Sequence, residues 1–508
     1  MTYLSRLAAV ALLLLMSTAA CCAAPVPGTE PADHSGTAQR FTPEQLRADF
    51  DALYAGLKSA HYDLFARRSQ REYDALYRSM RAGFDHELGL DEARLRFQRF
   101  AAYGRIAHAN IELPSDGWER FRKAGGKAFP LYLRVVNGRA YVNEDDSGID
   151  GIAQGDEVLA VEGKPVAKWM EGPSALVSAD NDYLRDAQME HAWPLLVWLS
   201  GGTRDQFALR LQKADGHRVE LTLPARSRAE FTAAEAKHPP HFELAGDTRE
   251  ARMLDQRTAY LRPGPFYDNR PGAADIWDNT AFKTFLDQAF DQFSAAGAQR
   301  LLIDLRDNPG GDNSFSDLLV ARIADRPFRF TNSFEIKVSA ATTAANRKRL
   351  DGASDAMAQR MDAAYAGKPE GSRVMFEIEP TPPRAAGRFT GKVFVLINRH
   401  SYSNTVLVAA IVQDYRFATI LGEETSDLAS TYGAMEKFSL PNTGIEVGYP
   451  KARILRPNGK LDARGVRPDI EIATPIVTGT DDAVLARARA IVNEQAADGD
   501  GKRRSDQP

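Results

Sequence analysis

Cysteine is almost absent from this 508-residue chain, which has two, Cys21 and Cys22, next to each other near the N-terminus. Cleavage of a leader after Ala24 would remove both, and the mature chain would then have no disulfide, no thiolate metal site and no cysteine nucleophile. Alternatively, Cys21 is lipidated, and the lipid is then the chain's only contact with a membrane. We expect simple cleavage, because Thr18 stands where a lipoprotein signal usually has Leu or Val.

Long hydrophobic runs and a strong excess of charge are also lacking. The apolar run from Leu7 to Met16 is too short for a membrane helix. With Arg6 before it and small residues after it, this run predicts an export signal over residues 1–24, and therefore a periplasmic or secreted protein. The net charge of −4, without a basic tract, argues against a nucleic-acid partner. The basic cluster at 502–504 is more typical of a solvated end.

The remaining composition is that of a large globular protein. Hydrophobic residues make up 44% and charged residues 26%, which suffices for about three domains without a metal or a cofactor. Residues 25–40, rich in Pro, Gly and Ala, predict a flexible spacer. Residues 41–127 predict an N-terminal helical region, which begins at Thr42-Pro43 and has apolar residues at helical spacing.

From about Phe129 the pattern changes to strands. Apolar residues alternate from Leu131 to Val135, and a Gly-Asp turn at 155–156 leads into a second alternating strand. Two more strands, 207–211 and 219–223, follow further along. This order resembles a PDZ domain, which we place at residues 128–225. Many PDZ domains bind a peptide end as an added strand, whereas the alternative is a β-rich insert without peptide affinity.

The second half of the chain alternates strands and helices. Residues 226–251 are polar and predict a linker, and residues 252–480 predict an α/β domain. Within that domain, the polar, Ala-rich and Pro-rich stretch 340–387 indicates an insertion or a lid. Residues 481–508 predict a C-terminal helix and a disordered tail.

The first chemical motif of this domain is DLRDNPGG at residues 304–311. It follows a buried strand and precedes a helix, and its adjacent glycines, Gly310 and Gly311, allow backbone N–H groups to point at a bound group. The motif lacks the Gly-Lys-Ser/Thr end of a nucleotide-binding loop, and no magnesium-binding pattern accompanies it. Oxyanion binding is the function that this motif favours.

The second motif is Ser401-Tyr402-Ser403-Asn404, between a strand at 393–397 and a helix that begins at about Asn404. A serine at a strand-to-helix turn is held exposed on a rigid support, and the helix N-terminus favours developing negative charge. The alternative is that Ser401 or Ser403 merely caps the helix.

The third motif, GVRPD at 465–469, completes an ordered set that resembles the C-terminal-processing (tail-specific) and tricorn-type serine peptidases. The resemblance implies an α/β protease core of the ClpP/crotonase type with an N-terminal helical domain and an inserted PDZ-like β domain. It also implies that Ser403 is the nucleophile, and that the N–H of Asn404 joins that of Gly310 or Gly311 in an oxyanion hole.

The base departs from the pattern of the bacterial processing branch, in which a lysine follows the Gly-Glu element. Residues 425–432 contain no lysine, and Lys437 lies further along in a predicted strand. The tricorn-type branch instead uses an early histidine and a late carboxylate. Its pattern implies His108 as the base, although the residues that flank it differ, and Asp462 in place of the family's Glu.

Two other histidines are weaker candidates for the base. We expect His61 to be a packed histidine of the helical region, and His400 is too near Ser403 along the same turn to reach its hydroxyl well. The resemblance therefore predicts a triad of His108, Ser403 and Asp462.

These residues predict an exported serine peptidase that acts on proteins or peptides, without a metal or an organic cofactor. The alternative is a non-catalytic ligand- or peptide-binding protein on the same fold, as retinoid-binding relatives illustrate. A scaffold that acts through the PDZ-like part alone would leave the ordered protease motifs unexplained. The sequence indicates no particular substrate or oligomeric state.

Overall fold

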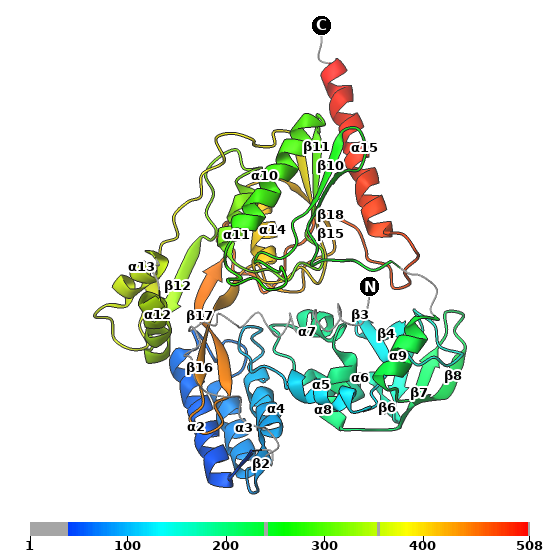
Figure 1. The fold of residues 1–508 in the computed structure, drawn as a ribbon, viewed down its shortest axis with the longest axis vertical. Coiled ribbons are helices and arrows are strands. Elements are labelled where there is room, and N and C mark those ends of the chain that lie inside the picture. The colour runs from blue at the N-terminus through cyan, green and yellow to red at the C-terminus, as the bar shows by residue number, and fades with distance from the viewer. Residues whose placement is uncertain (1–38, 238–241, 353–355, 506–508) are drawn as a thin grey trace. The chain divides into compact units, whose positions relative to one another are not determined.

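The computed structural model describes residues 39–237, 242–352 and 356–505 (Figure 1). The predicted export signal with Cys21 and Cys22, and nearly all of the predicted spacer, lie outside these residues. The chain divides into two compact units, and the chain passes between them several times. The first unit comprises residues up to 236, 334–376 and 432–453, and the second comprises 237–333, 377–431 and 454–508.

Helices form the beginning of the first unit. Thr42 caps the first helix: its side chain accepts from the backbone of Gln45, whose own side chain binds the Thr42 backbone. Phe50 lies at the centre of the core that the helices share and contacts the rings of Phe97 and Phe100. The helices are α2 (Pro43–Ala60), α3 (Gln70–Ala82) and α4 (Leu90–Ala102), with a short pair of strands, β1 (Arg40–Phe41) and β2 (Leu88–Gly89).

Two later segments of the chain belong to the same unit, although the sequence predicted them inside the α/β domain. They form a four-stranded sheet whose apolar side chains, such as Val447 and Tyr449, complete the core of the three helices. The predicted insertion at 340–387 contributes two helices and one of these strands. The elements are β12 (Ser333–Lys337), α12 (Ala340–Gly352), α13 (Ala356–Tyr365), β13 (Arg373–Met375), β16 (Thr431–Ser439) and β17 (Glu446–Leu455).

The region predicted as PDZ-like contains the strands that the sequence indicated, in an antiparallel sheet of order β3-β4-β5-β7-β8. Three helices between β6 and β7 were not predicted, and Trp193 at the start of α8 is fully buried and donates to Leu133 O at 2.7 Å. The PDZ-like assignment itself stays a prediction. The strands are β3 (Leu131–Val136), β4 (Arg139–Asp145), β5 (Glu157–Val161), β6 (Lys164–Pro165), β7 (Gln206–Gln212) and β8 (Arg218–Pro224), and the helices nearby are α5 (Ser115–Lys123), α6 (Val166–Ser174), α7 (Asp182–Met189), α8 (Trp193–Gly201) and α9 (Arg228–Glu235).

Helix α9 occupies part of the segment that was predicted as a linker. Ser227 and Glu230 form a capping box at its start, a local signal that the polar composition of the segment concealed.

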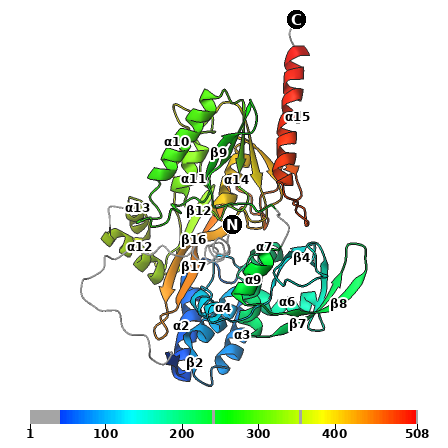
Figure 2. The ribbon, with the colours of Figure 1, turned by 45° about the vertical axis from the view of Figure 1, so that its right-hand side comes forward.

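The second unit is built on a six-stranded, mostly parallel sheet of order β18-β15-β14-β11-β10-β9. Its central strands are apolar at consecutive positions because both faces are covered. Helices α10, α11 and α14 lie on one side and α15 on the other (Figure 1, Figure 2). The elements are β9 (Glu250–Met253), β10 (Thr258–Arg262), α10 (Thr280–Ala295), β11 (Arg300–Asp304), α11 (Asn313–Val320), β14 (Lys392–Ile397), α14 (Asn404–Asp414), β15 (Thr419–Gly422), β18 (Ile470–Glu471) and α15 (Ala483–Ser505).

The C-terminal helix α15 continues to Ser505, where the sequence predicted a disordered tail. Its first turns pack on the sheet through Val484, Ala488 and Ile491. In the part of the chain that the structure describes, no helix has both the length and the apolar character needed to cross a membrane.

Candidate active site

The first two motifs meet because β11 and β14 are neighbours in a parallel sheet. Asp304 at the end of β11 pairs with Leu396 near the end of β14, so the loops that follow the two strands leave the same edge. A backbone hydrogen bond of 3.0 Å from Tyr402 N to Asn308 O joins these loops directly.

Ser403 stands at the junction of the second loop and α14 in a strained backbone conformation. Its φ of 53° and ψ of −124° are unusual for a residue with a side chain. It is half-buried, and its side chain makes no capping hydrogen bond to the helix. The alternative that Ser403 merely caps the helix is therefore not supported. A strained serine at a strand-to-helix turn is the geometry of a nucleophile elbow.

Ser401 has a different part in the same turn. Its Oγ donates to Leu305 O at 2.7 Å and accepts from Asn398 N at 3.1 Å, and the residue is fully buried. It therefore ties the two motif loops together and leaves Ser403 as the accessible hydroxyl of the pair.

Asn308, which the sequence placed in the first motif without a role, organises both loops. Its Oδ1 accepts from Gly310 N at 2.9 Å and from the Thr405 hydroxyl at 2.8 Å. Its Nδ2 donates to Gly264 O at 2.7 Å, and the residue is almost completely buried. One amide side chain thus fixes the glycine loop against the first turn of α14.

The glycine pair lies against the Ser403 turn so closely that side chains are excluded. A Cβ on Gly310 would lie 2.7 Å from Tyr402 O and 2.9 Å from Asn404 N, and its φ is +93°. Because Gly310 N already donates to Asn308, the N–H of Gly311 is the better candidate for the oxyanion hole. Among the described residues, the backbone N–H groups of Gly311 and Asn404 donate to no protein acceptor.

Asp427 is a residue of this site that the sequence analysis missed. The Ser403 N–H donates to its Oδ2 at 2.8 Å, and the Leu428 N–H donates to its Oδ1 at 2.8 Å. The residue is fully buried, and burial raises the pKa of its carboxyl to about 6, against the opposing effect of the two amides. The sequence analysis considered residues 425–432 only for their lack of a lysine. The available signal was a lone Asp in an otherwise uncharged loop that follows a parallel strand.

The third motif lies beside the Asp427 loop. Val466 N donates to the Thr425 hydroxyl at 2.9 Å, and Ala429 N donates to Arg464 O at 3.1 Å. Gly465 fits there only because it has no side chain, since a Cβ would lie 1.9 Å from Thr425 O. Asp462 is exposed on the loop just before this contact, and within the described residues its carboxylate forms no hydrogen bond or ion pair.

His108 belongs to the first unit, whereas Ser403 and Asp462 belong to the second. It lies in the loop after α4 and is nearly buried. Burial lowers the pKa of its imidazole, and the nearby carboxylate of Asp180 opposes this shift. Asp180 also accepts a hydrogen bond from Ala107 N at 3.0 Å. The carboxylate that opposes the shift in the His108 pKa therefore also holds the loop that carries His108.

The other two histidines have partners of their own. Nδ1 of His400 lies 3.3 Å from Oδ1 of Asp307. His61 is fully buried, burial lowers its pKa to about 3, and its Nδ1 accepts from Asp63 N at 3.0 Å. His61 is thus a packed, neutral histidine, as expected. In the described part of the chain no group of His, Cys, Asp and Glu side chains could hold a metal ion.

The described residues thus bring together a strained serine, a buried carboxylate that holds its backbone, and two backbone N–H groups without a protein acceptor, all on an α/β core. Residues 272–472 match peptidase family S41. The match assigns an S41 peptidase domain of mixed α/β fold to these residues, and the chain is a serine-type peptidase. The resemblance drawn from the motifs is confirmed.

Solved structures show the same fold over most of the chain. A mutant of CPAF is 15% identical, with 85% of this chain and 93% of that chain covered and a TM-score of 0.58. Mature CPAF is 16% identical, with 84% and 92% covered and a TM-score of 0.56. None of the curated proteins matches this chain.

Proposed function

We propose that this protein is an exported peptidase that cleaves peptide bonds in proteins or peptides through a triad of Ser403, His108 and Asp462. The observation that carries the proposal is the Ser403 turn, with its strained backbone and the available N–H groups of Asn404 and Gly311 beside it. Its export rests on the signal pattern of residues 1–24.

The chemistry is acyl transfer. His108 takes the proton of the Ser403 hydroxyl while Ser403 Oγ attacks the peptide carbonyl. The N–H groups of Asn404 and Gly311 bind the resulting oxyanion. His108 then gives the proton to the leaving amine, and water releases the acyl group by the reverse sequence. Asp462 holds the imidazole in the tautomer that presents its basic nitrogen to Ser403. The burial of His108 suits this task, because it favours the neutral imidazole.

The test is hydrolysis of an unstructured protein, such as casein, together with labelling by a fluorophosphonate. Ser403→Ala should abolish both. Ser294→Ala, on the exposed face of α10, is the matched control and should retain both. Hydrolysis that survives Ser403→Ala would reject Ser403 as the nucleophile, and a wild-type chain that neither cleaves nor reacts would favour the non-catalytic binding protein.

A further inference from the structure

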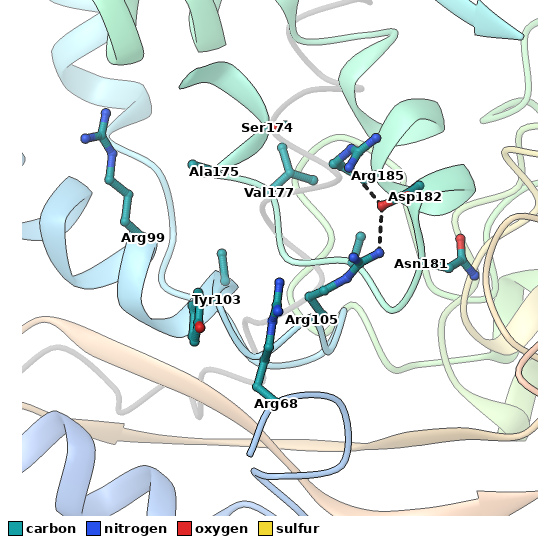
Figure 3. Close-up of a pocket in the computed structure, with 12 residues that line it drawn as sticks. Arg68, Arg99, Tyr103, Arg105, Ser174, Ala175, Val177, Asn181, Asp182 and Arg185 are labelled. Carbon is teal, nitrogen blue, oxygen red and sulfur yellow. Dashed lines mark hydrogen bonds and ion pairs between the residues drawn. The ribbon is translucent and has the colours of Figure 1, made fainter. Parts of the chain in front are cut away.

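A cavity of about 200 Å³ opens in the first unit, among α4, α6 and α7 (Figure 3). Its lining includes four arginines, which come from four separate places: Arg68 before α3, Arg99 on α4, Arg105 after α4 and Arg185 on α7. The lining has one carboxylate, that of Asp182. Such a hollow concentrates positive charge where the surrounding protein reduces screening by water.

The ion pairs within the lining leave much of this charge unneutralised. Oδ1 of Asp182 accepts from both Arg105, at 2.6 Å, and Arg185, at 2.8 Å, as Figure 3 shows. One carboxylate therefore serves two guanidinium groups. Arg99 stands apart from them and forms no hydrogen bond or ion pair of its side chain with any residue that the structure describes.

Two carboxylates outside the lining also pair with these arginines. Asp186 binds Arg185, and Glu72 lies 3.5 Å from Arg68. Even with these included, three carboxylates face four guanidinium groups.

Arg68 is positioned at the cavity by an aromatic ring. Its guanidinium stacks over the ring of Tyr103, 4.9 Å from the ring centre, and points up beside Arg105 in Figure 3. Its Nε is buried and has no hydrogen-bond acceptor among the described residues. The stack on Tyr103 holds this guanidinium group at the wall of the cavity.

The size of the cavity limits what it can bind. At about 30 Å³ for each water, it holds about seven waters, or one amino-acid side chain, and is too small for a nucleotide. Val177 and Ala175 add apolar surface to the lining, against which methylene groups can pack. Guanidinium groups in turn match the geometry of a carboxylate. A glutamate side chain has both parts.

We propose that this pocket binds the carboxylate of an acidic residue in a polypeptide, so that the peptidase favours acidic substrates. The proposal rests on the proposed function only in taking a polypeptide as the substrate. The pocket adjoins the loop of the candidate base, since Arg105 and His108 lie in the same loop and Asp180, which holds that loop, lies between Ala179 and Asn181 of the lining.

The test is equilibrium binding of fluorescein-labelled peptides to the full chain that carries Ser403→Ala, measured by anisotropy. Two peptides are identical except for one central Glu or Gln, and each is made with a free and an amidated C-terminus. We expect the Glu peptide to bind about tenfold more tightly than the Gln peptide. If affinity instead increases with a free C-terminus, the pocket binds the terminal carboxylate of the peptide and not the Glu side chain.

Arg68→Gln and, as a second variant, the exposed Arg99→Gln should each reduce the preference for Glu, and Asp182→Asn should strengthen it by releasing two guanidinium groups. Arg210→Gln, an exposed arginine on β7, is the matched control and should change nothing. Equal affinity for all peptides, or a preference that survives Arg68→Gln together with Arg99→Gln, would overturn the proposal. Binding of inorganic phosphate without any preference among the peptides would overturn it as well.

The result of the peptide-binding test can be distinguished from that of the hydrolysis test. Because binding is measured on a chain without the Ser403 hydroxyl, a failure of hydrolysis in the wild type leaves the result intact. Hydrolysis without any preference for acidic peptides would reject the pocket alone.

Discussion

The backbone N–H of Ser403 donates a hydrogen bond of 2.8 Å to the carboxylate of Asp427. This contact fixes the backbone of Ser403, the proposed nucleophile, in a conformation that the chain would otherwise avoid. Because the next amide, that of Asn404, is the candidate oxyanion donor, the orientation of the whole turn depends on a buried acid that touches no reacting atom. We therefore expect Asp427 to act as a positioning residue for Ser403.

Asp427→Asn should lower kcat by about tenfold or more and leave KM nearly unchanged, because the amide group cannot accept from both Ser403 and Leu428. Steady-state kinetics of the two proteins would show this. Asp325→Asn, an exposed aspartate, is the control. A variant in which KM rises while kcat is retained would mean that Asp427 supports substrate binding and not the serine.

The raised pKa of Asp427 also predicts how the free energy of unfolding changes with pH. Because its folded-state pKa of about 6 lies above the ordinary 3.8, the folded chain binds the proton more tightly than the unfolded chain between these values. The contribution of Asp427 to the free energy of unfolding therefore falls as pH rises through 6 and is largest at acid pH. Relative to Asp427→Asn, the wild type should be more stable at pH 5 than at pH 7, by an amount on the order of 1 kcal/mol. Urea unfolding of both proteins at the two pH values measures the difference, and a difference that grows with pH would contradict the burial argument.

The sequence predicted the Ser403 turn because that site is local. A strand, a Ser-x-Ser turn and a helix follow each other within residues 392–414, and the glycine loop follows the neighbouring strand. Parallel pairing then brings the two loops to one edge without any further information.

Asp427 and the composition of the first unit depend instead on long-range packing. Asp427 reaches Ser403 only because the 425–430 loop folds back over the turn, supported by contacts from the 460–466 segment. In the same way, the strand 446–455 joins the N-terminal helices because Val447 fits their core, which no periodicity within that strand reveals. The helices between β6 and β7 were missed because their short apolar runs do not distinguish a helix from a strand.

His108 gives a prediction about the pH dependence of hydrolysis. Because burial lowers its pKa below 6.5, the neutral base should persist to lower pH, and kcat/KM should fall only below that value. Asp180→Asn removes the carboxylate that opposes the shift, so the acid limb of the profile should move to still lower pH. Asp150→Asn, an exposed aspartate of the same unit, should leave the limb in place. If the limb moved upward in Asp180→Asn, His108 would not be the titrating base.

The close approach of the glycine loop predicts a loss of activity in Gly310→Ala. The new Cβ would meet Tyr402 O at 2.7 Å and Ser403 Cβ at 3.0 Å, so the Ser403 turn must move. We expect the rate of fluorophosphonate labelling to fall by at least about a hundredfold, as the loss of an oxyanion donor would do. Gly272→Ala is the matched control, because Gly272 also has a positive φ but an added Cβ there would meet no neighbouring atom. Normal labelling of Gly310→Ala would show that this loop does not shape the site.

Asp462 is an exposed member of the proposed triad, so an effect of its substitution on activity can be separated from an effect on stability. Since its carboxylate contacts no group in the part of the chain that the structure describes, Asp462→Asn should change the free energy of unfolding by less than about 0.5 kcal/mol. If Asp462 orients His108, the same change should lower kcat by on the order of a thousandfold or more, because the imidazole then adopts the wrong tautomer. Asp462→Glu should recover much of that loss, and Asp481→Asn, on a nearby exposed stretch, should cause none. Full activity of Asp462→Asn would instead exclude this residue from the mechanism.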